Sequence, residues 1–296
     1  MRRAALWLPI IFCLITGCKQ APTVTVGKTK LTGTVMVLGF FSRNVVGIDE
    51  TSLRPGQRLS LPTYADNIII TPTGETFVIV VGRDNPRCDL FALEDNRFVE
   101  KLSFPGKYCP GEIMQVLETP RGVYLAYGST TFTSANSFGA GLFDLRTKVF
   151  ETYDIPGLVR GFGVLDGIPI AYAGGPAHRG FKSGIFMFRT AKPVEVIAEL
   201  DPNHRYRKAL FMDGVMVGVR AANNVRFDSD PTNHTVSFVD VKTGQILSSE
   251  KTARSPYDAV VGGGKLYVSH FNDAKPSDYG HTVTVFDLIT RKIISV

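Results

Sequence analysis

Thr282-Val283-Thr284-Val285-Phe286-Asp287, near the end of the chain, repeats the earlier Thr235-Val236-Ser237-Phe238-Val239-Asp240. In both hexapeptides, β-branched and aromatic residues lead to a closing aspartate, which is typical of a β-strand that ends in a turn. Weaker copies come earlier, at Gly47-Ile48-Asp49, Leu90-Phe91-Ala92, Leu142-Phe143-Asp144 and Phe186-Met187-Phe188-Arg189. Successive copies end 43 to 52 residues apart, which indicates a chain built from one repeated unit.

A second set of residues has the same period. Turn glycines between two apolar runs recur every 41 to 50 residues, at Gly33, Gly74, Gly122, Gly167, Gly214 and Gly264. Two of them stand in Asp-Gly pairs and two in Pro-x-Gly turns, and both patterns favour tight hairpins because glycine tolerates a positive φ. Two independent markers with one period make a structural repeat the simplest interpretation.

Each period contains about four short β-rich runs, which in the last unit are 258–261, 265–270, 282–287 and 292–296. Four strands in 40 to 50 residues are typical of a propeller blade. The sequence therefore predicts an all-β chain, a single β-propeller of four-stranded antiparallel blades. Six blades are expected, and seven stay open if residues 20–60 hold a compressed unit. A pair of β-sandwiches is the alternative fold.

The last two units resemble the YVTN-repeat β-propeller family. Lys265-Leu266-Tyr267-Val268-Ser269-His270 followed by 282–288 matches its unit, as does 235–240 with Thr243-Gly244, although His270 stands where the family usually has Asn. The resemblance implies blade structure and an exported or surface-attached protein, and it implies no particular activity. The only tryptophan, Trp7, precedes the repeats, so tryptophan-docked propeller classes are not favoured.

The N-terminus has the features of an export signal. Arg2 and Arg3 precede an apolar run over 4–15, which is too short to span a bilayer of about 30 Å comfortably. Leu14-Ile15-Thr16-Gly17-Cys18 then resembles a bacterial lipobox, which implies cleavage before Cys18 and lipidation of that cysteine. The expected organisation is a signal peptide over 1–17, a lipidated N-terminus and tether over 18–30, and the propeller over 31–296. An ordinary signal peptide is the alternative.

Composition limits the partners. The formal charge is +6 without a Lys/Arg run, so nucleic-acid binding is not expected. Lys19 follows Cys18, and by the enterobacterial sorting rule this implies an outer-membrane lipoprotein that faces the periplasm. Cys88 and Cys109 are the cysteines beyond the lipobox, and an exported chain predicts a disulfide between them. Two free thiols are the alternative.

The predicted working side is the one opposite the tight glycine turns. Alternation of the hairpins places the long polar loops 129–138, 174–183, 221–233 and 271–280 together there. The candidate binding face consists of polar residues in or beside these loops: His178, Arg179, His204, Arg205, Arg226, Asp228, Asp230, His270, Asp273 and Asp278. No catalytic motif or cofactor signature accompanies them, whether a metal binds there is open, and His234 is interpreted as structural.

The predicted function is therefore non-catalytic. We expect a membrane-anchored propeller that binds or scaffolds an envelope protein, held at the membrane by a lipid on Cys18. A metal-assisted lactonase- or lyase-type enzyme and a small-ligand sensor are the alternatives, both using the long-loop face.

Overall fold

The computed structural model describes most of the repeat region. The described residues are 34–38, 44–49, 55–61, 65–70, 75–81, 88–95, 97–104, 110–134, 137–147, 149–175, 181–189, 194–201, 206–220, 234–252, 256–270 and 283–296. Within these ranges the chain is all-β and has no α-helix. Among the same residues, no helix has the length and apolar content needed to cross a membrane.

Among the described residues, six antiparallel sheets follow one another along the chain, each made of strands adjacent in sequence. Sheet 1 has three described strands, β1 (Thr34–Leu38), β2 (Asn44–Asp49) and β3 (Pro55–Ser60), and the other five sheets have four each. Sheet 2 contains β4 (Ala65–Ile70), β5 (Thr76–Val81), β6 (Cys88–Glu94) and β7 (Arg97–Phe104); sheet 3 contains β8 (Pro110–Thr119), β9 (Gly122–Ser134), β10 (Ser137–Asp144) and β11 (Phe150–Ile155). Sheet 4 contains β12 (Leu158–Leu165), β13 (Ile168–Gly174), β14 (Ser183–Met187) and β15 (Glu195–Leu200); sheet 5 contains β16 (Lys208–Met212), β17 (Val215–Arg220), β18 (Thr235–Asp240) and β19 (Ile246–Lys251). Sheet 6 contains β20 (Pro256–Gly262), β21 (Lys265–His270), β22 (Val283–Asp287) and β23 (Lys292–Ser295).

The tight turns form where the sequence predicts them. Asp166-Gly167 and Asp213-Gly214 join the first two strands of sheets 4 and 5, and all four residues have a positive φ. Two positive φ values in a row are what a two-residue hairpin of primed type requires, which explains the Asp-Gly pairs. Gly264 also has a positive φ and lies in the equivalent turn of sheet 6. Gly33 and Gly74 lie outside the described residues.

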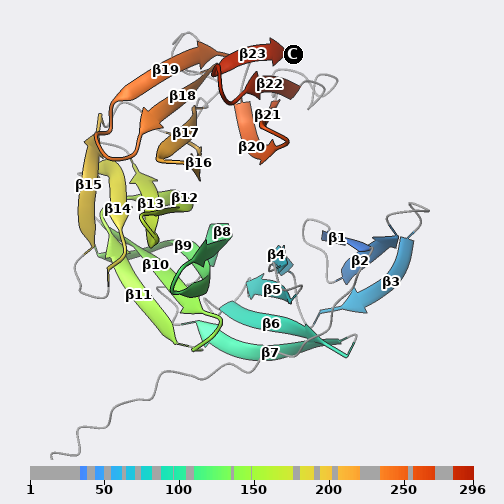
Figure 1. The fold of residues 1–296 in the computed structure, drawn as a ribbon. Helices are drawn as coiled ribbons and strands as arrows, with labels where there is room; N and C mark the ends of the chain where they lie inside the picture. The colour runs from blue at the N-terminus through green and yellow to red at the C-terminus, as the bar shows by residue number, and fades with distance from the viewer. Residues whose placement is uncertain are drawn as a thin grey trace, which may run out of the picture.

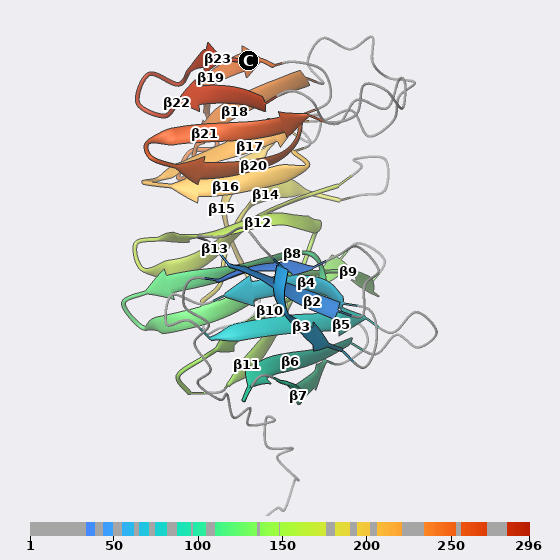
Figure 2. The ribbon, with the colours of Figure 1, turned by 90° about the vertical axis from the view of Figure 1, so that its right-hand side faces the viewer.

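The sheets succeed one another around a common centre, with the first strand of each sheet on the inside and the last on the outside (Figure 1). The inner strands of neighbouring sheets contact one another directly, β8 against β12 and β12 against β16. Seen from the side, the sheets are stacked with their strands running in similar directions (Figure 2). Sheet 6 and sheet 1 lie on either side of an opening in the arrangement (Figure 1).

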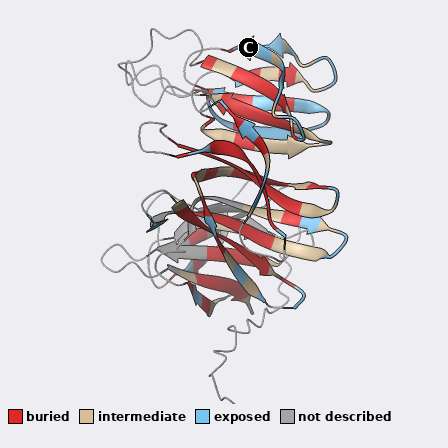
Figure 3. Cartoon of the chain, turned by 90° about the vertical axis from the view of Figure 1, so that its left-hand side faces the viewer, coloured by how far each residue is buried: buried red, intermediate tan, exposed pale blue. Residues whose placement is uncertain are grey.

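The core lies between the sheets. Large buried side chains from one sheet pack on those of the next, as Phe162 and Phe186 do with Ala126 and Leu142 between sheets 3 and 4. Sheet 5 packs on sheet 6 in the same way. Figure 3 shows buried residues along the strands and exposed residues at the turns.

One predicted loop is wrong. The stretch 129–138 was expected to be irregular, but β9 continues to Ser134 and β10 begins at Ser137. The pairing shifts register between Phe138 and Ala140, which accommodates the extra residues as a bulge in a long hairpin. The physical reason is composition, because Thr130-Thr131-Phe132-Thr133 is rich in strand-favouring residues.

Candidate binding site

Most of the predicted long-loop face lies outside the described residues. This applies to His178, Arg179, His204, Arg205, Arg226, Asp228, Asp230, Asp273 and Asp278, so the predicted face stays a prediction for these nine. Cys18 and Cys109 also lie outside, whereas Cys88 is the first residue of β6.

His270 is the one described member of that face. It ends β21, and its side chain is buried, with 5% of its surface exposed. Its Nε2 lies 2.7 Å from Oγ1 of Thr284, a fully buried residue on the neighbouring strand β22. This burial and hydrogen bond favour a structural role for His270 within sheet 6. His234 is likewise buried, and its carbonyl oxygen accepts from the backbone and hydroxyl of Thr252, as its structural interpretation expects.

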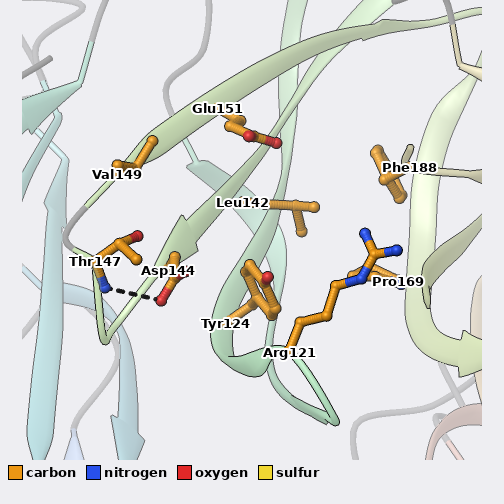
Figure 4. A pocket seen from close by; sticks show the side chains of 9 residues that line it. All are labelled: Arg121, Tyr124, Leu142, Asp144, Thr147, Val149, Glu151, Pro169 and Phe188. Atoms are coloured by element: carbon orange, nitrogen blue, oxygen red, sulfur yellow. Dashed lines mark hydrogen bonds between the residues drawn. The ribbon is translucent and has the colours of Figure 1, made fainter. Parts of the chain in front are cut away.

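A hollow of about 230 Å³ lies on the opposite side, at the short turns, where sheet 3 meets sheet 4 (Figure 4). Arg121 reaches into it from the β8–β9 turn, and Thr147 and Val149 come from the turn between β10 and β11. Sheet 4 contributes Pro169 from β13 and Phe188, which directly follows β14. Both sheets therefore supply walls of the hollow.

The floor of the hollow is apolar and closely packed. Leu142 and Phe188 expose 3% and 4% of their surfaces, and Pro169 is also buried. The Phe188 ring packs edge-on against Tyr153 of β11, with 4.9 Å between ring centroids. The backbone N–H of Phe188 donates to the carbonyl of Pro169 at 2.9 Å. A ligand group placed here would meet fixed apolar side chains.

The rim is polar and carries both signs of charge. Arg121 and Glu151 are exposed and line the hollow with Tyr124 and Asp144 (Figure 4). The Asp144 carboxylate accepts from the backbone N–H groups of Arg146 and Thr147, at 2.8 and 3.1 Å, so it is held in the β10–β11 turn. Glu151 accepts from the Tyr153 hydroxyl.

Both tyrosines here stay protonated at neutral pH. Burial, with the negative charges of Asp144 and Glu151 nearby, raises the pKa of Tyr124. Burial and the hydrogen bond to Glu151 raise the pKa of Tyr153. A phenol whose pKa is raised is a poor base or nucleophile, so these groups can donate hydrogen bonds but are not activated for catalysis. The arrangement suits binding of an apolar group that carries polar atoms at its edge.

Metal ligation finds no support within the described ranges, where no group of three His, Cys, Asp or Glu side chains is placed to hold an ion. The hollow was not predicted from the sequence, because the expected binding residues were those of the long polar loops. The sequence contains only a weak sign of this hollow: Arg121 lies in a Pro-x-Gly turn, and Asp144 is the last residue of a repeated strand.

Comparison with known proteins gives the fold alone. No family model matches the chain, and no curated protein matches it in sequence. Among solved structures, the chain is similar to Kuenenia stuttgartiensis hydrazine synthase, with a TM-score of 0.62 and 16% identity over 86% of this chain and 80% of that one. A functionally unknown protein from Desulfotomaculum acetoxidans gives a TM-score of 0.60 and 13% identity, over 90% of this chain and 79% of that one. A protein of unknown function from Bacteroides caccae gives a TM-score of 0.52 and 9% identity, over 88% of this chain and 91% of that one.

Proposed function

We propose that this chain is a lipid-anchored β-propeller of six blades that binds an envelope protein and catalyses no reaction. The observation that carries the architecture is the succession of antiparallel sheets around a common centre, first strand inside and last strand outside (Figure 1). Each sheet is one blade, and sheet 1 is the first.

The lipobox-like residues 14–18 support the anchor. Lipidation of Cys18 would hold residues 19–30 as a tether, and Lys19 fits an outer-membrane protein facing the periplasm. An anchor would confine the propeller to the membrane surface and so raise its effective concentration toward a partner held there, which suits a binding module.

The hollow between sheets 3 and 4 is the described surface that best suits a partner. Its buried Leu142 and Phe188 would cover one apolar side chain, and Arg121 and Glu151 at the rim would pair with charges flanking it. An apolar centre inside a polar rim is the usual anatomy of a protein–protein contact. The nearby surface from Glu118 to Tyr124, with Arg146, extends this contact area.

A site-specific photo-crosslinker tests the proposal in intact cells. The crosslinking residue replaces Val149, which lines the hollow and is 43% exposed, and Val196 on β15 serves as control at 42% exposed. We expect one crosslinked envelope protein from position 149 and none from position 196. The same experiment with Cys18→Ser should lose the product, since the anchor is gone. No product from position 149, or equal products from both positions, would overturn the proposal.

A further inference from the structure

Sheet 3 presents two carboxylates in the hollow that it forms with sheet 4. Leu142 of β10 lies opposite Glu151 of β11 in the strand pairing. Asp144 is two residues after Leu142, so its side chain points to the same face of the sheet. Asp144 and Glu151 are therefore diagonal neighbours, at positions that are about 7–8 Å apart in antiparallel sheets. One cationic group placed between the two carboxylates would contact both.

Within the described part of the chain, no cation pairs with Asp144 or Glu151. Figure 4 shows the Arg121 guanidinium near Phe188 and not between the two carboxylates. Burial first, and then the charges of Asp144 and Glu151, raise the pKa of Tyr124, while Arg121 opposes them less strongly. The hollow is therefore a place that favours an added positive charge.

Sheet 4 fills the equivalent place with an arginine of the chain itself. Arg189 ends the repeated strand of sheet 4, as Asp144 does in sheet 3. Met187, two residues before Arg189, pairs with Glu195 of β15, as Leu142 pairs with Glu151. The Arg189 Nε lies 2.9 Å from the Glu195 carboxylate and 3.2 Å from the Met187 sulfur. A guanidinium at this place of a sheet thus pairs with the acid of the outer strand and contacts the apolar side chain beside it.

Sheets 5 and 6 have a single acid at the same two positions. Asp240 and Asp287 end their repeated strands. The residue of the outer strand that corresponds to Glu151 is Ser248 in sheet 5 and Ser295 in sheet 6. Among the described positions of sheets 3 to 6, sheet 3 is therefore the one with two acids and no arginine. This departure from the repeat leaves the place of the guanidinium to be filled from outside the chain.

We propose that the hollow receives the side chain of an arginine of the envelope partner, an inference that rests on the proposed function. The methylene groups of that arginine would lie on Leu142 and Phe188, which form the apolar floor. Its guanidinium would pair with Asp144 and Glu151.

A guanidinium fits this arrangement better than an ammonium group. Its planar fork of N–H donors can serve two carboxylates at once, whereas an ammonium is a compact point charge. The ring of Tyr124 also lines the hollow, and an aromatic face attracts a guanidinium stacked on it. Arg121, at the rim, would then pair with an acidic residue next to the partner's arginine.

Titration of the purified full-length protein with Nα-acetyl-arginine methylamide tests the inference. The amide chemical shifts of Leu142 and Glu151 report the binding, and the uncharged isostere Nα-acetyl-citrulline methylamide is the comparison compound. We expect the arginine compound to bind roughly tenfold more tightly, since hydrogen bonds between charged groups are about twice as strong as neutral ones. Equal affinity for the citrulline compound, or tighter binding of the corresponding lysine compound, would overturn the inference.

Variants of the acids locate the binding. Glu151→Gln removes one charge, and Asp144→Asn removes the other while its side-chain oxygen can still accept from the N–H groups of the turn. Each change should weaken binding of the arginine compound several-fold. Glu195→Gln is the matched control, because it stands at the equivalent position of sheet 4, and it should leave the affinity unchanged. Equal affinities in Glu151→Gln and Glu195→Gln would overturn the inference.

The photo-crosslinking product from position 149 separates this inference from the proposed function. In the same cells, Glu151→Gln should lower the yield of that product several-fold, and Glu195→Gln should not. An unchanged yield in Glu151→Gln would overturn the partner's arginine and leave the proposed function standing. Absence of any product from position 149 would overturn the proposed function, even where the titration succeeds.

Discussion

Phe286 of β22 lies edge-on to Phe238 of β18, with 6.2 Å between ring centroids and 63° between ring planes. Both rings are buried, at 0% and 1% exposure, and each belongs to the third strand of its sheet. Phe238 is the fourth residue of the hexapeptide 235–240, and Phe286 is the fifth residue of its copy 282–287. The two copies therefore place aromatic side chains against each other between sheet 5 and sheet 6. An edge-to-face pair adds to the stability that burial alone provides.

Phe286→Ala should loosen sheet 6 from sheet 5. Truncating a buried phenylalanine costs about 3–5 kcal/mol, because contacts are lost and a cavity remains. We expect faster amide hydrogen exchange throughout β20–β23, with β12–β15 unchanged, together with a lower urea midpoint. Phe286→Leu keeps most of the volume and should lose less than half as much stability. Equal exchange in the wild type and the alanine variant would mean that the rings do not hold the two sheets together.

Gly161→Ala should be far more harmful than Gly262→Ala. A Cβ at position 161 on β12 would stand 1.9 Å from the carbonyl oxygen of Ala209 on β16, so the two inner strands would have to separate. A Cβ at position 262 meets no atom within 4 Å. We expect a loss of about 1–3 kcal/mol at 161 and a change within about 0.5 kcal/mol at 262. Thermal unfolding of the two variants side by side measures the difference, and similar midpoints would contradict the close approach of β12 and β16.

The sequence predicted local structure well where strand and turn chemistry repeats. The run 282–287 predicts β22 to within one residue, and the pair Asp213-Gly214 predicts the turn between β16 and β17. Both predictions succeed because residues close together in the sequence determine a strand or a tight turn. The hollow was not predictable in this way. Leu142 and Phe188 lie on different sheets, and only the packing of one sheet on the next brings them together. His270 shows the same limit, since a polar residue at a strand end gave no sign that it would be buried and hydrogen-bonded to Thr284.

Acid should weaken the turns that follow the repeated strands. The Asp240 carboxylate accepts from the backbone N–H and the hydroxyl of Thr243, both at 2.8 Å, and Asp287 accepts likewise from Thr290 at 2.7 and 2.9 Å. These hydrogen bonds lower the pKa of both carboxyls in the folded chain. A lowered folded pKa means that the stabilisation is complete above the unfolded pKa, about 3.9, and is lost as the pH falls through the folded pKa.

The double variant Asp240→Asn, Asp287→Asn tests this pH dependence. The melting temperature of the wild type should fall below about pH 4 more steeply than that of the variant, because the variant has no carboxylate to protonate at these turns. The two curves should run parallel between pH 5 and pH 7. Parallel curves below pH 4 as well would exclude these aspartates as a source of acid sensitivity.

If the protein is exported as proposed, Cys88 and Cys109 are expected to form a disulfide. Cys88 begins β6, where its backbone is paired with Phe104 at the end of β7. Cys109 lies outside the described residues, five positions after Phe104 in the sequence and one before Pro110, the first residue of β8. The pairing of Cys88 with Phe104 thus brings Cys88 close to the start of the segment that contains Cys109. Closing a loop of about 20 residues would stabilise the fold by about 3 kcal/mol in the chain-entropy model.

Peptide mapping without reductant should therefore find the two cysteines in one linked pair of peptides. Cys88→Ser should remove that pair and lower the urea midpoint, and reductant should then have no further effect on the variant. Cys13→Ser is the matched control, because that residue lies in the predicted signal peptide and should change neither result. Free thiols at both positions in protein taken directly from the envelope would refute the pairing. An unchanged midpoint on reduction would show instead that a disulfide is present but does not stabilise the fold.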